Sequence, residues 1–359
     1  MGLFSSLFSE QLIGLDIGVS GIKAVELARG KTPKLVAYNR IPLPEGVISP
    51  EGEFLERDTV LLALKKLFSF KGFSTRQVAV GAAGNAIITK KISVPRMTAE
   101  ELNHQLYWEA EQYIPFNIAD VNLDFAILGT SAASDGGAPK MDVLLVAAKK
   151  DYVAALTSLV EEADLEPSVI DNQAFALGNS FEFNYSHVLG KSPQGALSII
   201  LDFGAGSTKI SAVEGDKTTF TRELRQSGLS CTQRIAEHLG CGFEDAEKAK
   251  IMQFADPQIR GVISEFNQGL VEEITRTLDF VVGQTVGSSI QGIFACGGAS
   301  RTAGLIKLLA EKVTAPVGPL NPIQNIAGTG RKMNAQAIRE LSYLGAVAIG
   351  LSLRTTGDA

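Results

Sequence analysis

Two stretches of the chain place an aspartate among apolar residues and glycines, with a lysine soon after it. The first is LIGLDIGVSGIKAVEL, which contains Asp16, and the second is LSIILDFGAGSTKISAV, which contains Asp202. A charged side chain in an apolar strand is costly to bury unless it meets a partner. Glycine turns expose backbone N–H groups that suit phosphate oxygens, and a carboxylate at a strand end can hold Mg²⁺. Each stretch therefore predicts either a phosphate and magnesium site or a plain hairpin whose aspartate caps its own turn.

The two stretches share one plan. Residues of the same type coincide when they are aligned: Asp16 with Asp202, Gly18 with Gly204, and Lys23 with Lys209. The separation is far too long for a solenoid repeat, so it indicates two similar domains in one chain. Two such hairpins facing each other would bind phosphates from both sides, which favours a ligand site over a plain hairpin.

Two later motifs would complete such a site. In ACGGAS, Gly297 and Gly298 lie between an apolar strand and a helix, where a ligand can approach the backbone; the alternative is a tight turn. In GFEDAEKAK, Glu247 and Lys250 share one face of an expected helix. They would contact a ribose or a base, or simply form a surface ion pair.

Composition restricts the class of protein. A chain of 359 residues with 45% hydrophobic and 20% charged residues is typical of a globular protein with two or three domains. The formal net charge of −6 gives no basic field, so we expect no nucleic-acid partner. No apolar stretch is long enough to span a membrane. The chain has no P-loop and no dinucleotide-binding fingerprint, and its three cysteines form no CxxC pair.

The elements that must position these motifs follow from hydrophobic periodicity. We expect strands over 12–16, 22–27, 35–41, 77–82, 197–203 and 207–213, and helices over 58–68 and 150–163. A mostly helical block is expected from about 230 to 289, and SYLGAVAIGLSL is expected to form an apolar helix.

The segment from Lys90 to about Val169 has the character of an insertion. Thr98 and Glu101 make a capping box that predicts a helix, followed by strands in VNLDFAILG and DVLLVAAKK around an exposed loop, SAASDGGAPK. The expected division is 1–90 with 169–195 for the first domain, 91–168 for an inserted α/β subdomain and 196–359 for the second domain, with a helical part at about 228–290.

The order of these motifs resembles that of the actin-like ATPase superfamily. The stretch from Asp16 to Ser20 resembles its first phosphate motif, the stretch from Asp202 to Thr208 the second, and the stretch from Gly297 to Ser300 the adenosine motif. Residues 169–177 and 344–353 resemble its two interdomain helices. The resemblance implies an α/β, actin-like (ribonuclease H-like) duplicated two-domain fold with an FtsA-like inserted subdomain.

The same resemblance implies that ATP and Mg²⁺ bind between the two domains. The residues that would bind the nucleotide are Asp16, Gly18, Val19, Ser20, Lys23, Asp202, Gly204, Ala205, Gly206, Ser207, Thr208, Glu247, Lys250, Gly297, Gly298, Ala299 and Ser300. Asp16 and Asp202 would hold Mg²⁺ through water. Hydrolysis also needs a polar residue that orients the attacking water, and Asp171 stands at the matching position, with Gln173 close by. Asp171 has an alternative role as a helix N-cap, so the sequence leaves hydrolysis open.

Closer cues resemble the PilM family of type IV pilus assembly proteins. They are the start MGLFS, DIGVSGIKAVEL, the run VPRMTAEEL to EAEQYIPF, and VIDNQAFAL. The resemblance implies a cytoplasmic ATP-binding protein of the pilus assembly complex, held at the inner membrane through protein partners. Its implied partners are the cytoplasmic N-terminal peptide of PilN, bound beside the inserted subdomain, and other inner-membrane and motor components of the pilus machinery.

Two alternatives within the superfamily have weaker support. An FtsA-like cell-division protein is expected to end in an amphipathic membrane-binding helix, whereas this chain ends in the polar stretch GLSLRTTGDA. A small-molecule kinase needs contacts to a substrate hydroxyl inside the cleft, and no sugar-contact motif is evident in the sequence.

Overall fold

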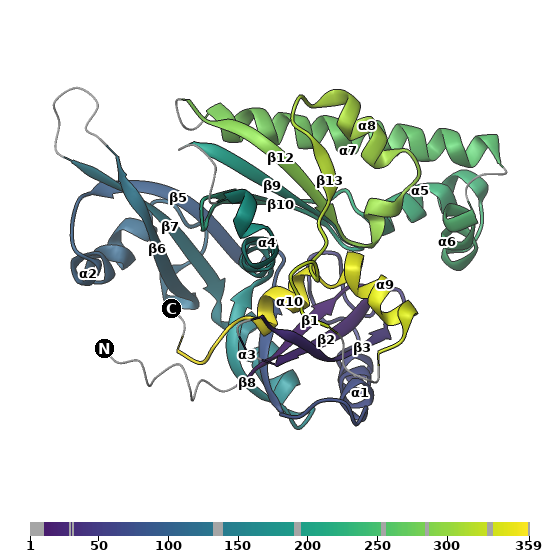
Figure 1. The fold of residues 1–359 in the computed structure, drawn as a ribbon, viewed down its shortest axis with the longest axis horizontal. Coiled ribbons are helices and arrows are strands. Elements are labelled where there is room, and N and C mark those ends of the chain that lie inside the picture. Colours follow the sequence, from purple (N-terminus) through teal and green to yellow (C-terminus); the bar gives the residue numbers. More distant parts are fainter. Residues whose placement is uncertain are drawn as a thin grey trace.

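The fold consists of two five-stranded sheets and one three-stranded sheet, with helices packed between and around them (Figure 1). The computed structural model describes residues 11–28, 30, 32–131, 139–189, 195–252, 256–283, 287–328 and 333–357. Most of the loop expected at SAASDGGAPK lies outside these residues. No helix within them is both long enough and apolar enough to cross a membrane.

The first sheet has the strand order β3-β2-β1-β4-β8. Its strands are β1 (Ile13–Gly18), β2 (Gly21–Ala28), β3 (Lys34–Pro42), β4 (Gln77–Ala82) and β8 (Glu166–Asn172). The first three form an antiparallel meander, whereas β1, β4 and β8 run parallel. One face buries Ile13 and Leu15 of β1 against α1 (Arg57–Phe68) and α3 (Lys150–Glu161). The other face carries Asp16, because side chains alternate along a strand.

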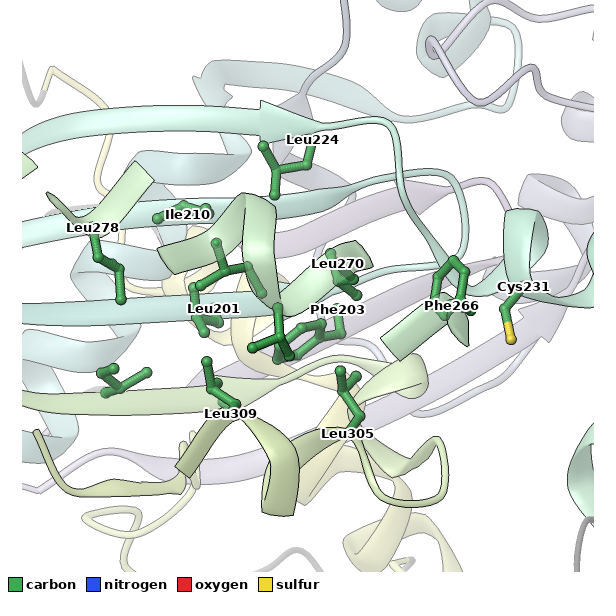
Figure 2. Packing of buried hydrophobic residues seen from close by; sticks show 14 of the residues in the cluster. Leu201, Phe203, Ile210, Leu224, Cys231, Phe266, Leu270, Leu278, Leu305 and Leu309 are labelled. Atoms are coloured by element: carbon green, nitrogen blue, oxygen red, sulfur yellow. The ribbon is translucent and has the colours of Figure 1, made fainter. Parts of the chain in front are cut away.

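The second sheet repeats this topology in the order β11-β10-β9-β12-β13. Its strands are β9 (Ala196–Phe203), β10 (Thr208–Glu214), β11 (Lys217–Leu224), β12 (Ser289–Cys296) and β13 (Val317–Pro319). In Figure 2, Leu201 and Phe203 of β9 lie in one apolar cluster with residues of α7 (Pro257–Gly283) and α8 (Leu305–Lys312). The expected helical block contains α5 (Gly228–Leu239), α6 (Phe243–Met252) and α7.

The duplication expected from the sequence is present in the backbone. Asp16 of β1 lies directly opposite Lys23 of β2, and Asp202 of β9 lies directly opposite Lys209 of β10. Because the strand orders also correspond, each aspartate occupies the same place in its own sheet. The duplicated α/β fold class is therefore confirmed.

The three-stranded sheet has the order β5-β7-β6 and consists of β5 (Ile87–Pro95), β6 (Val121–Ser131) and β7 (Lys140–Lys149). Helix α2 (Ala99–Ala110) packs on it through Leu102, Leu106 and Ala110. The capping box is formed, because the Thr98 backbone N–H donates to Glu101 Oε2 over 2.7 Å and the Glu101 backbone N–H donates to Thr98 Oγ1 over 3.2 Å. The strands of this sheet lie between Ile87 and Lys149, and α3 packs in the core of the first sheet.

The helices expected over 169–177 and 344–353 differ in their limits from those in the structure. Residues up to Asn172 belong to strand β8, because they pair with β4 and extend the first sheet, and α4 (Gln173–Leu189) begins only after them. Near the end of the chain, α9 (Ala335–Leu344) stops at Gly345, and the buried helix α10 (Ala346–Ser352) follows. Helix α10 packs beside β1 and α4, as Figure 1 shows.

Candidate nucleotide-binding site

A cavity of about 720 Å³ lies where the two duplicated hairpins approach each other. Asp16, Gly18 and Lys23 line it from the first sheet, and Asp202, Gly204 and Lys209 line it from the second. Such a volume is in the range of small-molecule and cofactor sites. The positions that the sequence singled out by repetition therefore meet at one cavity.

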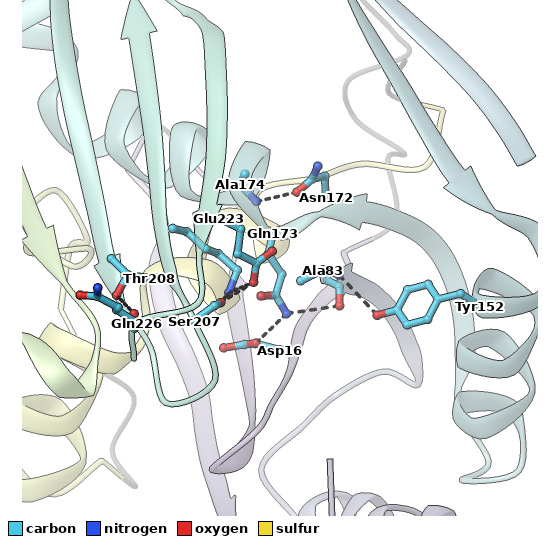
Figure 3. Close-up of polar contacts among 12 residues, drawn as sticks. Asp16, Ala83, Tyr152, Asn172, Gln173, Ala174, Ser207, Thr208, Glu223 and Gln226 are labelled. Atoms are coloured by element: carbon cyan, nitrogen blue, oxygen red, sulfur yellow. Dashed lines mark hydrogen bonds and ion pairs between the residues drawn. The ribbon is translucent and has the colours of Figure 1, made fainter. Parts of the chain in front are cut away.

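Asp16 sits in a polar contact network at the end of β1. Its Oδ2 atom accepts from Lys23 Nζ over 2.5 Å. Its Oδ1 atom accepts from Gln173 Nε2 over 3.3 Å (Figure 3). Gln173 Nε2 also donates to the Gly81 carbonyl over 3.5 Å. A Cβ atom on Gly81 would stand 2.9 Å from Gln173 Cγ, so the glycine makes room for this side chain. The lone aspartate is therefore tolerated because its strand ends at the cavity beside a cation.

The second hairpin carries a different network. Glu223 of β11 accepts from the Ser207 hydroxyl, and Lys209 Nζ lies 3.2 Å from Ser207 Oγ and 3.6 Å from Glu223 Oε1. Asp202 has Cys296 Sγ 3.8 Å from its Oδ1 atom. Its carboxylate thus has weaker neutralising contacts than that of Asp16.

The pKa values of this hairpin show the cost of burying its charges. Burial raises the pKa of the Asp202 carboxyl, while Lys209 opposes the rise and the Asp16 carboxylate across the cavity adds to it. Burial alone would lower the pKa of Lys209, but the carboxylates of Glu223, Asp202 and Asp16 together outweigh it and raise that pKa. A cation placed between Asp16 and Asp202 would relieve their mutual repulsion.

The far end of the cavity lies among α5, α6 and the turn after β12. Lys250 Nζ is 2.7 Å from Glu247 Oε2 and also donates to Thr232 Oγ1 and the Gly228 carbonyl over 2.6 and 3.0 Å. The pair therefore ties α6 to the start of α5 and lines the cavity as well. Gly297 has φ 85°, and a Cβ atom there would stand 2.4 Å from Asp202 Oδ1. This close approach requires glycine.

Most residues expected to bind the nucleotide line the cavity. They are Asp16, Gly18, Val19, Ser20, Lys23, Asp202, Gly204, Ala205, Gly206, Ser207, Glu247, Lys250, Gly297, Gly298 and Ala299. Thr208 and Ser300 are not among the lining residues. The Thr208 hydroxyl donates to the Gln226 carbonyl over 2.7 Å, and the Ser300 hydroxyl donates to the Gly297 carbonyl over 2.6 Å. Both hydroxyls thus stabilise turns around the cavity.

Asp171 is also absent from the cavity lining. Its Oδ2 atom lies 3.5 Å from Nε of Arg354, which follows α10. Gln173 lines the cavity and contacts Asp16. Of these two polar side chains, the structure therefore places the glutamine at the cavity, because the chain enters α4 at Gln173 while Asp171 still belongs to β8.

Sequence reasoning missed Arg40 of β3 and Glu223 of β11, which both line the cavity. Arg40 lies directly opposite Lys23, and Glu223 lies directly opposite Lys209. Neither belongs to a motif. The signal that would have found them is the register of the third strand in each sheet.

The oxygen ligands at the cavity suit a magnesium ion. Asp16 and Asp202 offer carboxylates from its two sides. Among the described residues, no group of three or more histidine, cysteine, aspartate or glutamate side chains is placed to hold a metal by itself. This pattern fits Mg²⁺, which is usually held by one or two carboxylates together with water and substrate phosphates.

Comparison with known proteins assigns the chain to a family. A family model described as type IV pilus assembly protein PilM matches residues 14–356. The chain belongs to the PilM family. A solved structure of a PilM–PilN type IV pilus biogenesis complex contains a chain 30% identical to this member of the family, with a TM-score of 0.83. The match covers 96% of this chain and 98% of that one.

More distant structures share the fold of this PilM family member. The ethanolamine utilization protein EutJ from Carboxydothermus hydrogenoformans is 15% identical with a TM-score of 0.54, and the match covers 96% of this chain and 89% of that one. MreB5 of Spiroplasma citri bound to ADP is 12% identical with a TM-score of 0.53, over 95% and 94% of the two chains. At these identities the likeness concerns the fold alone. Membership of the PilM family favours a role in pilus assembly over cell division or a small-molecule kinase.

Proposed function

We propose that this protein is a nucleotide-binding component of the type IV pilus assembly machinery. It would bind ATP with Mg²⁺ between its two domains and the cytoplasmic N-terminal peptide of PilN at another surface. The observation that carries the proposal is the pair of glycine turns with Asp16 and Asp202, which line one cavity from two equivalent sheets. Through PilN and other pilus components the protein would be held at the cytoplasmic face of the inner membrane.

The cavity offers a separate place to each part of the nucleotide. The nucleoside would lie at the end formed by Gly297, Gly298 and Lys250, where glycine allows close approach to the backbone. The phosphates would lie between the two hairpin turns, whose backbone N–H groups and lysines suit phosphate oxygens. Asp16 and Asp202 would hold the Mg²⁺ ion, which supplies positive charge to the phosphates. One distant relative of the same fold, MreB5 of Spiroplasma citri, was solved both with ADP and with AMPPNP bound, which supports a nucleotide in this cleft.

An isosteric substitution tests nucleotide binding. Asp16→Asn removes the carboxylate and leaves the shape of the side chain, so we expect the affinity for AMPPNP with Mg²⁺ to fall about tenfold or more. Asp245→Asn is a matched control, because it removes the same charge from an exposed ion pair with Lys248. Isothermal titration calorimetry on both variants measures the effect. Equal affinities for the two variants and the unmodified protein would remove Asp16 from the site.

Hydrolysis of bound ATP would depend on Gln173, because its amide group lies at the cavity beside Asp16. We expect Gln173→Ala to lower phosphate release about a hundredfold, because the loss of one positioned hydrogen-bonding amide group typically costs that much in rate. Asp171→Asn serves as the comparison and should leave phosphate release nearly unchanged, since Asp171 pairs with Arg354. The reverse ranking of the two variants would return the role to Asp171.

Binding of the PilN peptide is supported by the family relative solved in a PilM–PilN complex. A pull-down with a synthetic peptide of the PilN cytoplasmic N-terminus, with and without AMPPNP, tests it. We expect the peptide to retain the protein and the retained amount to change with nucleotide. Nucleotide can change the affinity of the protein for the peptide only if the nucleotide binds one arrangement of the two domains more tightly than another. Failure of the peptide to retain the protein under both conditions would refute this part of the proposal.

A further inference from the structure

Arg40 lies in a row of charged residues that crosses the first sheet. Asp16 of β1 is opposite Lys23 of β2, and Lys23 is opposite Arg40 of β3. Residues directly opposite each other in neighbouring strands project from the same face of a sheet. The three side chains therefore lie side by side on the face that meets the cavity, and all three line it.

Arg40 lacks the anionic partner that the neighbouring lysines have. Lys23 is paired with Asp16, Lys209 with Glu223, and Lys250 with Glu247. Within the described residues Arg40 forms no ion pair, and its buried Nε atom has no hydrogen-bond acceptor. A buried donor without an acceptor is costly, so a native structure that keeps one calls for an explanation. A bound anion supplies both the acceptor and the opposite charge.

The second sheet provides an internal comparison for Arg40. Glu223 takes the equivalent place there, because it lies opposite Lys209, which lies opposite Asp202. The row in the first sheet is therefore net positive and the row in the second sheet net negative. Since the two equivalent sheets carry opposite charges at this position of the third strand, an arginine is not required there to form the sheet.

The surroundings of Arg40 place it on the nucleoside side of Lys23. Tyr38, two residues away on the same strand face, packs in one buried cluster with Leu341 of α9. Tyr343 belongs to α9 and lines the cavity, and its carbonyl accepts from the Gly297 backbone N–H over 2.8 Å. The guanidinium group of Arg301 lies over the Tyr343 ring, 4.9 Å from its centroid. Arg40 thus lines the cavity from the strand that contacts α9, and α9 also contacts the turn expected to meet the nucleoside.

We infer that Arg40 binds the phosphate of the nucleotide that is nearest to the nucleoside. This inference rests on the proposed nucleotide site. The planar guanidinium group donates in a fork that matches two oxygens of one phosphate, and it is always charged. A nucleoside diphosphate and a nucleoside triphosphate both present this phosphate. Arg40 therefore contributes equally to the binding of both, and it sets nucleotides apart from free nucleosides.

The test compares Arg40→Gln with the unmodified protein in titrations with ADP and with AMPPNP, each with Mg²⁺. The affinities for both ligands are expected to fall by the same factor, about tenfold to a hundredfold, because a charge-assisted hydrogen-bond pair is lost. Arg40→Lys keeps the charge but not the forked donor geometry. Its affinities for both ligands should lie between those of Arg40→Gln and the unmodified protein. Arg222→Gln is the matched control, because Arg222 pairs with Glu273.

The outcomes separate this inference from the site on which it rests. A loss confined to AMPPNP, or unchanged affinities for both ligands in Arg40→Gln, overturns the inference and leaves the nucleotide site standing. No binding of either ligand by the unmodified protein overturns both. Thermal melting without ligand shows whether each variant is folded, and Arg40→Lys replaces Arg40→Gln as the deciding variant if the glutamine variant does not fold.

Discussion

At the scale of single residues, burial determines the reactivity of the thiols. Cys231 in α5 is fully buried, and burial raises the pKa of its thiol to about 11, with Lys250 opposing the rise and Glu247 adding to it. Cys241, just after α5, is only partly buried. Alkylating reagents attack the thiolate, so both the raised pKa and the lack of access protect Cys231.

This contrast predicts the order of modification. With iodoacetamide at pH 8, we expect Cys241 to be alkylated in the native protein long before Cys231, whose thiolate fraction is about one in a thousand. Peptide mass spectrometry over time measures both sites, and a sample unfolded in urea shows that both react once exposed. Equal rates in the native protein would mean that α5 opens readily.

Residue types alone were enough to find Asp16 and Asp202, because a carboxylate in an apolar strand beside glycines is unusual. Arg40 and Glu223 could not be found in this way. Each is an ordinary charged residue in a strand, and its place at the cavity depends on pairing with Lys23 or Lys209. Local sequence does not encode that register, so the structure was needed.

At the scale of elements, glycines determine how closely α10 packs. A Cβ atom on Gly350 of α10 would stand 1.7 Å from the Ala176 carbonyl oxygen of α4, and one on Gly14 of β1 would stand 1.9 Å from the Ala348 carbonyl oxygen of α10. Real Cβ atoms do not come this close to backbone oxygens, so a side chain at either place must push the elements apart.

A pair of glycine substitutions tests this packing. Gly350→Ala should lower the free energy of unfolding by about 1–3 kcal/mol or more, because the backbone of α4 must move. Gly261→Ala in α7 is the control, since a Cβ atom added there would meet nothing within 4 Å. There we expect a gain of about 0.5–1 kcal/mol from helix propensity. Urea titration measures both, and a stabilised Gly350→Ala would contradict the close packing.

Strands and helices with clear periodicity were predicted well, including β4 over Gln77–Ala82 and α1 over Arg57–Phe68. The helix expected to begin at Val169 was placed too early. Val169 to Asn172 pair with β4, and this tertiary contact outweighs the local pattern. Helix α10 was foreseen as an element, but its position beside β1 depends on glycine contacts between distant parts of the chain.

At the scale of the whole molecule, the two domains touch at the mouth of the cavity. A Cβ atom on Gly206 would stand 2.6 Å from Val19 Cγ2 and 3.2 Å from the Pro50 carbonyl oxygen. The turn of the second hairpin thus rests directly on the turn of the first. A larger residue at position 206 would hold the two hairpins apart.

This contact predicts that a larger residue at position 206 lowers the affinity for nucleotide and that a smaller residue at position 19 restores it. Gly206→Ala should lower the affinity for AMPPNP about tenfold, because the overpacked contact costs about 1–3 kcal/mol in the closed arrangement. Its melting temperature without ligand should fall slightly, because the contact with Val19 is already present without nucleotide. Adding Val19→Ala removes the methyl group nearest to the new Cβ atom and should recover much of the affinity. Gly242→Ala is the control, because its new Cβ atom would have no neighbour within 4 Å. If calorimetry finds that the double variant binds AMPPNP no more tightly than Gly206→Ala does, steric contact between residues 206 and 19 does not explain the loss.

Helix α10 also bears on the order in which the chain folds during synthesis. The core of the second domain draws on residues from Leu197 to Leu309, which are close together in sequence. The cleft-side face of the first sheet, by contrast, packs Val25, Leu27 and Leu35 against Leu341, Ala348 and Ile349. Domains generally fold from the N-terminal end as the ribosome releases the chain. Here this face of the first sheet stays uncovered until residues made after the core of the second domain have emerged, so the nascent chain carries an exposed apolar face until translation has passed α10.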